Sequence, residues 1–422
     1  MAAKEEAVAA RLAGLTAGPG LAGPRAEARA RLEVMGLPGR RDEYWRWTDP
    51  AALNGATPAA AKAAEDDEAP LFDALDRLKI VFVDGVFDAA ASDDLTLAGV
   101  EIARLADKIP AWAEALYGTL EAAGQNPVKR PFAALNTAQA TDGVLIRVTA
   151  KAEKPINLIY VHKSETSDPI LHHLVHLEPG AELTLLETGP AGARFNKVME
   201  VDVGSGASFH HIRAQGPDSE CRAVTHIFAR VAEKALFKSF TLTVNGALTR
   251  NEAVIEIIGN DAVAHVAGAA LGDGATGPFL HDDTVFVTHQ GLRCESRQVF
   301  KKVLKHGAIG TFQGKILVKP GAQKTDGYQI SQSLLLDDDS QFLAKPELEI
   351  YADDVKCSHG STTGAIDETA LFYLRSRGVP EEEAKGLLVL SFLADAIDEI
   401  EDAGLKEDIV ARLETWLARH RD

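Results

Sequence analysis

Cysteine is scarce in this 422-residue chain, which contains only Cys221, Cys294 and Cys357, far apart in the sequence. An odd number of widely separated cysteines argues against a disulfide framework and predicts a reducing, cytoplasmic setting. No Cys-x-x-Cys pair is present, whereas an iron–sulfur cluster is usually held by four cysteines. We therefore do not expect the chain to hold such a cluster by itself.

Long apolar runs and an excess of basic charge are also lacking. No stretch approaches the roughly 20 apolar residues of a membrane span, and the first residues lack the basic and apolar parts of a signal peptide. The formal charge is −18, which argues against nucleic acid and anionic membranes as partners, because both attract basic surfaces. The glycine-rich loop that cradles phosphates is missing as well, so we expect no ATP site in this chain.

The first of three regions, residues 1–138, has a mostly helical pattern. Apolar residues recur at helical spacing over 5–15, 25–35 and 110–123. An alanine-rich and then acidic stretch at 51–69 is typical of a linker, and two apolar runs around Asp-Gly predict a hairpin at 79–87.

An aromatic cluster in this region, around Tyr44, Trp45 and Trp47, lies among charged residues. Aromatic side chains in such a setting usually have a structural role. We therefore expect Trp45 or Trp47 to anchor this segment by packing.

In the second region, residues 139–350, the helical period is absent, and apolar residues alternate with others in short runs such as 144–148 and 237–244. Turn residues followed by alanine separate many of them, at Gly180-Ala181, Gly206-Ala207, Asn245-Gly246-Ala247, Asp261-Ala262 and Gly321-Ala322. A sandwich, a barrel or a β-solenoid would give this mainly-β pattern. We favour the solenoid, because coils that stack only on their neighbours tolerate uneven lengths.

The third region, residues 351–422, returns to helix after Gly364. Segments at 368–375 and 406–420 flank a longer helix that begins at Pro380, where proline and the acids after it suit a helix start. These helices either cap the solenoid or form a docking platform for another protein. Apolar spacing alone does not separate the two.

Cys357 and His359 form the most informative motif, at the transition from strands to helices. In an extended strand, residues two apart share a face and lie roughly 6.6 Å apart. A thiol and an imidazole at this spacing suit one soft metal ion or one sulfur species.

This motif and other polar residues also allow an enzymatic interpretation. Cys357 and His359, oriented by Asp353 or Asp354, resemble the catalytic group of a cysteine hydrolase. Catalytic thiol and imidazole groups usually come from separate elements, which argues against it. The three aspartates at 337–339 could serve a carbohydrate-active enzyme, which uses paired carboxylates, but such a run of charge is more typical of a solvated corner.

Histidine clusters offer a different metal site. His172 and His176 share one strand face, with His173 on the other, and a metal site there would need two further ligands. Histidines on strands more often make ordinary hydrogen bonds.

Several segments, in order, resemble the SufB/SufD family of iron–sulfur cluster assembly scaffolds. They are 43–48, 134–138, 312–316, 324–329, 334–336, 345–350, 354–360 and 371–378. SufB-type chains typically carry an acidic residue where this chain has Gly360, so the resemblance favours the SufD branch.

The resemblance implies a right-handed parallel β-helix with helical regions at both ends. It implies a non-enzymatic scaffold that pairs with a SufB-like subunit, or with itself when alone. A SufC-like ATPase would dock on the C-terminal helical region. Cys357 and His359 would then bind a nascent cluster or its iron at the subunit interface, with His359 the better ligand. A purely structural role, in which both residues only pack the interface, stays open.

Overall fold

The computed structural model describes residues 2–64, 70–216, 220–244, 246–275 and 277–419. Residues 65–69 of the predicted linker, Asn245 of a predicted turn and His420 at the predicted end of the last helix lie outside this part.

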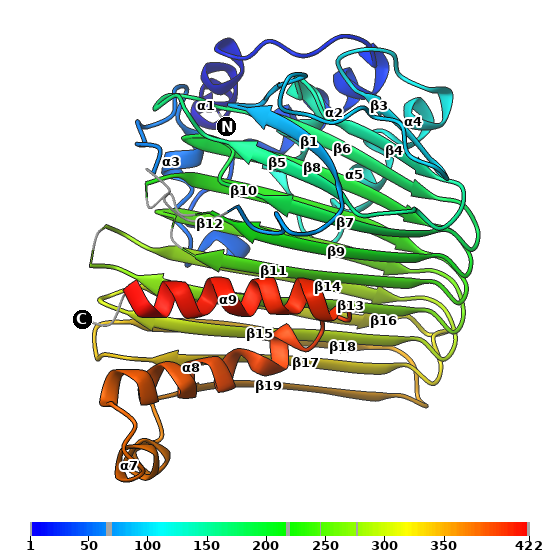
Figure 1. The fold of residues 1–422 in the computed structure, drawn as a ribbon. Helices are drawn as coiled ribbons and strands as arrows, with labels where there is room; N and C mark the ends of the chain where they lie inside the picture. The colour runs from blue at the N-terminus through cyan, green and yellow to red at the C-terminus, as the bar shows by residue number, and fades with distance from the viewer. Residues whose placement is uncertain (1, 65–69, 217–219, 245, 276, 420–422) are drawn as a thin grey trace.

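Two sheets facing each other form the body of the protein (Figure 1). The first sheet contains β1 (Leu78–Val83), β2 (Val86–Phe87), β5 (Ile156–Val161), β7 (Glu182–Thr188), β9 (Ser208–Gln215), β11 (Leu236–Val244), β13 (Val263–Asp273), β15 (Glu295–Lys305), β17 (Asp326–Leu335) and β19 (Lys356–Gly364). The second contains β3 (Val100–Arg104), β4 (Val144–Val148), β6 (Ile170–Leu177), β8 (Arg194–Val203), β10 (Arg222–Val231), β12 (Leu248–Ile257), β14 (Leu280–His289), β16 (Ile309–Val318) and β18 (Gln341–Ile350).

Successive strands from β4 onward alternate between the two sheets, so that each coil of the chain adds one strand to each. Neighbours within a sheet are parallel and in register over their length, as β10 is with β12. Only the β1–β2 and β3–β4 pairs are antiparallel among the described strands. This arrangement confirms the predicted parallel β-solenoid. Its strands extend past residue 350, because β19 belongs to the first sheet.

Stacked corners explain how uneven coils stay aligned. At the start of each first-sheet strand from β7 to β17 a residue with positive φ precedes a buried small residue. These pairs are Gly180-Ala181, Gly206-Ala207, Lys234-Ala235, Asp261-Ala262, Arg293-Cys294 and Lys324-Thr325. Main-chain bonds join one corner to the next, as from Lys234 N to Asn260 O at 2.8 Å. The alanines predicted at 181, 207 and 262 are therefore corner residues, and Cys294 occupies the same structural position.

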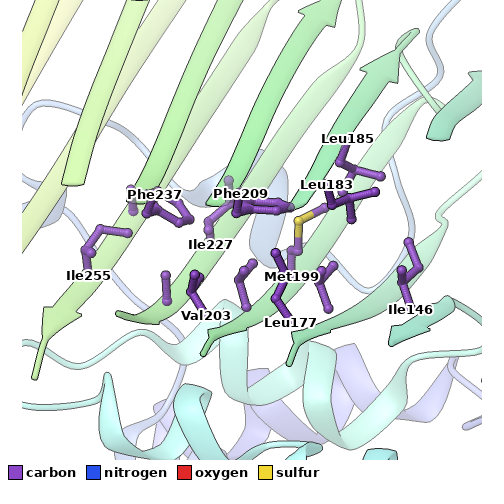
Figure 2. Close-up of a cluster of buried hydrophobic side chains, with 14 of the residues drawn as sticks. Ile146, Leu177, Leu183, Leu185, Met199, Val203, Phe209, Ile227, Phe237 and Ile255 are labelled. Atoms are coloured by element: carbon purple, nitrogen blue, oxygen red, sulfur yellow. The ribbon is translucent and has the colours of Figure 1, made fainter. Parts of the chain in front are cut away.

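The apolar core lies between the two sheets (Figure 2). Phe209 and Phe237, on neighbouring first-sheet strands, pack against each other with ring centroids 5.6 Å apart. Met199 and Ile227 of the second sheet belong to the same cluster. Inward-facing residues of this kind recur at every second position, as expected of strands that bury one face.

Most of the helices cover the outer faces of the two sheets. The helices are α1 (Ala2–Ala13), α2 (Ala22–Met35), the 3-10 helix η1 (Glu43–Trp45), α3 (Ala51–Asn54), α4 (Ala111–Leu116), α5 (Thr119–Ala123), α6 (Pro131–Gln139), α7 (Glu368–Ser376), α8 (Glu381–Ile397) and α9 (Ala403–Arg419). The N-terminal helices pack on the second sheet, and α8 and α9 pack on the first. In the described residues, no helix has the length and apolar character to span a bilayer.

Trp45 confirms the predicted packing anchor. Its side chain is 4% exposed, and the Arg250 guanidinium lies 4.1 Å from its ring centroid. Nearby, the Thr48 hydroxyl donates to Asp282 Oδ2 at 2.5 Å. Arg250 also donates to the Tyr44 carbonyl at 2.9 Å. The segment is thereby fixed across β12 and β14.

Candidate functional site at the open end of the solenoid

Strand β19 carries both residues of the Cys-x-His motif and is the last strand of the first sheet. Among the described strands it pairs with β17 alone, with Cys357 opposite Gly327 and His359 opposite Gln329. The two motif residues therefore continue two columns of side chains that stack from coil to coil.

Those columns face the interior of the solenoid. Gly327 and Gln329 lie on the buried face of β17, and the Gln329 amide donates to Gln298 Oε1 at 2.7 Å. A Cβ at Gly314 of the opposite sheet would lie 1.8 Å from Gln329 Nε2, so this side chain crosses the interior. His359 takes the same face one coil further on, where no later coil of the described chain covers it.

Cys357 closes a small apolar cluster at this end. It packs with Ile316, Val318 and Ala352, and a Cβ at Gly327 would lie 3.2 Å from its Sγ. Burial raises the pKa of the Cys357 thiol, and the charge of Asp326 acts in the same direction. The thiol of the free chain is therefore mostly protonated at neutral pH, and a metal would have to displace that proton.

His359 is exposed, while Cys357 is half-buried. The two side chains therefore differ in their access to a metal ion. The imidazole is accessible to an incoming ion, whereas the thiol is partly engaged in packing. Both donors suit iron. In the described part of the chain, no group of three or more His, Cys, Asp or Glu residues is arranged to hold a metal ion.

The strands that frame this end are both edge strands. Within the part of the chain that the structure describes, β18 pairs only with β16, and β19 only with β17. Each therefore presents a row of main-chain N–H and C=O groups along its outer side, and proteins normally cover such edges or pair them with another chain. Ile350 and Tyr351, at the end of β18 and just beyond it, are 39% and 58% exposed.

The hydrolase interpretation finds no support in the geometry. Asp353 and Asp354 are exposed and precede β19. Among the described residues, no hydrogen bond joins the Cys357 thiol, the His359 ring and these carboxylates. The raised pKa of Cys357 is the opposite of what an activated nucleophile requires.

The second enzymatic alternative, carbohydrate cleavage, is not favoured by the contacts of Asp337. Its carboxylate accepts from the backbone N–H groups of Ser340, at 2.8 Å, and Asp339, at 3.1 Å. It also accepts from the His306 N–H. It therefore stabilises a corner, as the sequence predicted.

The histidine cluster on β6 also has structural partners. His172 is fully buried and its Nε2 lies 2.8 Å from Glu200 Oε1. His173 contacts the Tyr160 hydroxyl at 3.0 Å, and His176 lies 3.2 Å from Asp202. The structure thus separates these rings into different contacts, and the interpretation as hydrogen-bonding histidines is confirmed.

A polar network inside the solenoid was missed at the level of sequence. Glu187 accepts from the Tyr160 hydroxyl and from His211 Nε2, each at 2.7 Å, and pairs with Lys197. One signal was available: Glu187 follows Leu183 and Leu185 at alternate positions of one strand, so it shares their buried face.

Helix α7 forms a second exposed feature and projects from the body beyond β19 (Figure 1). Asp367 caps it by accepting from the N–H groups of Thr369 and Ala370. Phe372 and Tyr373 are 73% and 57% exposed. Two neighbouring exposed aromatic rings are unusual for a surface without a partner.

Comparison with known proteins now identifies the class to which this solenoid belongs. The family described as SUF system FeS cluster assembly, SufBD core domain, matches residues 160–392. The chain belongs to this family.

Within the family the chain is of the SufD type. It is 28% identical over 406 residues to iron–sulfur cluster assembly protein SufD of Escherichia coli K12, covering 92% of both chains. It is 28% identical over 291 residues to SufD of Bacillus subtilis 168, covering 67% of this chain and 65% of that one. A SufBD family protein of Synechocystis is 27% identical over 417 residues, covering 92% of this chain and 89% of the relative.

Proposed function

We propose that this protein is a non-enzymatic scaffold subunit that acts with a SufB-like partner and a SufC-like ATPase to assemble iron–sulfur clusters. One observation carries the proposal: Cys357 and His359 lie side by side on the interior-facing side of an edge strand, at the open end of the solenoid. Two soft donors are thereby presented to whatever covers that end.

The donor count favours a shared site. An iron–sulfur cluster is commonly held by four protein ligands, and the Cys-x-His motif offers two. A second subunit packed against β18 and β19 would supply the others and would cover both exposed edges. The cluster is cargo in this scheme, and a site divided between two chains can release it when they move apart.

Within the shared site we assign the ligand role chiefly to His359. Its ring is exposed, whereas Cys357 is engaged in packing with Ile316 and Ala352. Binding through Cys357 requires loss of the thiol proton, which its raised pKa opposes. Cys357 then contributes mainly to the shape of the interface.

The ATPase is proposed to dock on α7 and the neighbouring part of α8. Phe372 and Tyr373 supply the aromatic anchors that protein interfaces prefer. Since the chain lacks a phosphate loop, the ATPase must supply any ATP hydrolysis. In the absence of a SufB-like subunit, the same open end would pair two copies of this chain. The three cysteines form no disulfide among the described residues, which suits a reducing cytoplasm.

The test is reconstitution with both partners, followed by measurement of iron and sulfide per complex. His359→Ala should lower cluster content strongly without disturbing assembly, because the residue is exposed. Cys357→Ala should have a smaller effect. Ser358→Ala is the matched control, because Ser358 is exposed on the opposite side of the same strand. Unchanged iron and sulfide in an intact His359→Ala complex would refute the ligand role.

A separate measurement tests the scaffold itself. The chain should copurify with a SufB-like chain and an ATPase. Turnover of an ester or glycan substrate by the purified chain, with neither partner bound, would overturn the proposal.

A further inference from the structure

A buried arginine inside the solenoid has no counter-ion among the described side chains. Arg213 lies on the inward face of β9 and is 3% exposed. Its Nη1 donates to Thr225 Oγ1 at 2.8 Å and to Asn251 Oδ1 at 3.4 Å. Its Nε and Nη2 atoms have no hydrogen-bond partner among the residues that the structure describes. A buried guanidinium with unpaired N–H groups carries a large desolvation cost.

The nearby carboxylates are already committed to other cations. Glu187 pairs with Lys197, and Asp283 accepts from Lys302 Nζ at 2.6 Å. This stretch of the interior therefore holds three basic side chains and two acidic ones. The basic residues are Arg213, Lys197 and Lys302, and the acidic residues are Glu187 and Asp283. Burial lowers the pKa of His211 and His281, so both rings are neutral and do not change the balance.

One more carboxylate belongs to the surroundings, and it is also occupied. Glu252 forms ion pairs with Arg130 at 3.0 Å and with Arg250 at 2.8 Å, on the outer side of β12. In the described part of the chain, no carboxylate oxygen comes within ion-pair distance of Arg213. The excess positive charge thus stays with Arg213.

A cavity adjoins this arginine. It has a volume of about 30 Å³, and its lining includes Arg213, His211, Ser239, Thr225, Asn251 and Asp283. About 10–15 Å³ accommodates one water-sized particle, so the cavity has room for one small ion with little to spare. The Ser239 hydroxyl lies 2.9 Å from His211 Nδ1, which leaves the free N–H groups of Arg213 as the main donors.

We propose that this cavity binds a small monovalent anion of about the size of chloride, held by Nε and Nη2 of Arg213. The anion supplies the missing counter-charge and satisfies the unpaired donors. Arg213 itself joins β9 to β10 and β12 through its bonds to Thr225 and Asn251, and the anion would hold its side chain in place. The site is distinct from the Cys-x-His end and does not depend on the proposed function.

Bromide provides the direct probe, because it replaces chloride and scatters anomalously. Crystals of the full chain grown in sodium bromide should show one anomalous peak within hydrogen-bonding distance of Arg213 Nε and Nη2. Electron density for water alone, without an anomalous peak, would overturn the proposal. This arm uses the unmodified protein and needs no variant to fold.

Solution stability gives an independent measurement. The thermal unfolding midpoint should rise with bromide concentration relative to gluconate at equal ionic strength, because an ion bound only by the folded state stabilises it. The halide-specific rise should vanish in Arg213→Met. It should persist in Arg297→Met, whose arginine is 48% exposed and pairs with Glu295. An equal rise in all three proteins would show a general effect of the anion that does not depend on Arg213, and it would refute the site.

Discussion

Acid should destabilise this solenoid through His289, and the effect can be estimated from its surroundings. The ring is fully buried at the end of β14, with Nε2 2.8 Å from Ser296 Oγ. Burial lowers its pKa from 6.5 to about 4. Between these values the unfolded chain binds a proton that the folded chain does not. Stability is therefore full above pH 6.5 and falls as the pH drops towards 4.

The magnitude follows from the same two values. A difference of about 2.5 units corresponds to about 3.4 kcal/mol over the full range, at about 1.36 kcal/mol per unit. Between pH 7 and pH 5 the loss is about 2 kcal/mol. His289→Gln keeps a polar partner for Ser296 but does not titrate in this range. Its free energy of unfolding should fall by about 2 kcal/mol less than that of the unmodified chain over this interval.

Urea unfolding at both pH values, followed by circular dichroism, measures this difference. Ser296→Ala is the control: it removes the hydrogen bond but keeps the buried imidazole, so it should retain the pH dependence. The reasoning is refuted if His289→Gln and the unmodified chain lose the same free energy on acidification.

Three further predictions concern packing and docking. Phe237→Ala should cost about 3–5 kcal/mol in urea unfolding, because Phe237 is fully buried between the sheets; a loss below 1 kcal/mol would contradict that packing. Trp45→Ala should make the segment near η1 more sensitive to protease while β11 to β19 stay protected, since Trp45 anchors that segment; unchanged cleavage would contradict the anchor. Phe372→Ser should weaken ATPase binding at least tenfold by calorimetry without lowering the unfolding midpoint, because the ring is 73% exposed; unaltered affinity would move the docking site elsewhere.

The solenoid could be predicted from sequence because its corners leave a visible pattern. Gly180-Ala181 and Gly206-Ala207 place a flexible residue before a small one, at positions that have positive φ and a buried neighbour. The same corner at Lys234 and Arg293 was not recognised. Non-glycine residues at positive φ give no compositional signal, and stacking of neighbouring coils holds them there.

The Cys-x-His motif was recognisable because strand geometry alone places Cys357 and His359 on one face. Sequence did not reveal that this face points into the solenoid at an uncovered end, which depends on the register with Gly327 and Gln329. Sequence also did not reveal that Arg213 is buried without a carboxylate partner, because its partners Thr225 and Asn251 come from other coils.

The open end at β18 and β19 also has a consequence for local stability. In a stacked array each coil is stabilised by its two neighbours, and a terminal coil has only one. The last coil is therefore the first to fray, and its amide hydrogens should exchange faster than those of β11 or β13. A partner that covers this end adds the missing neighbour and orders the coil as it binds. The strand that bears His359 is then expected to become rigid at the moment when the complex forms.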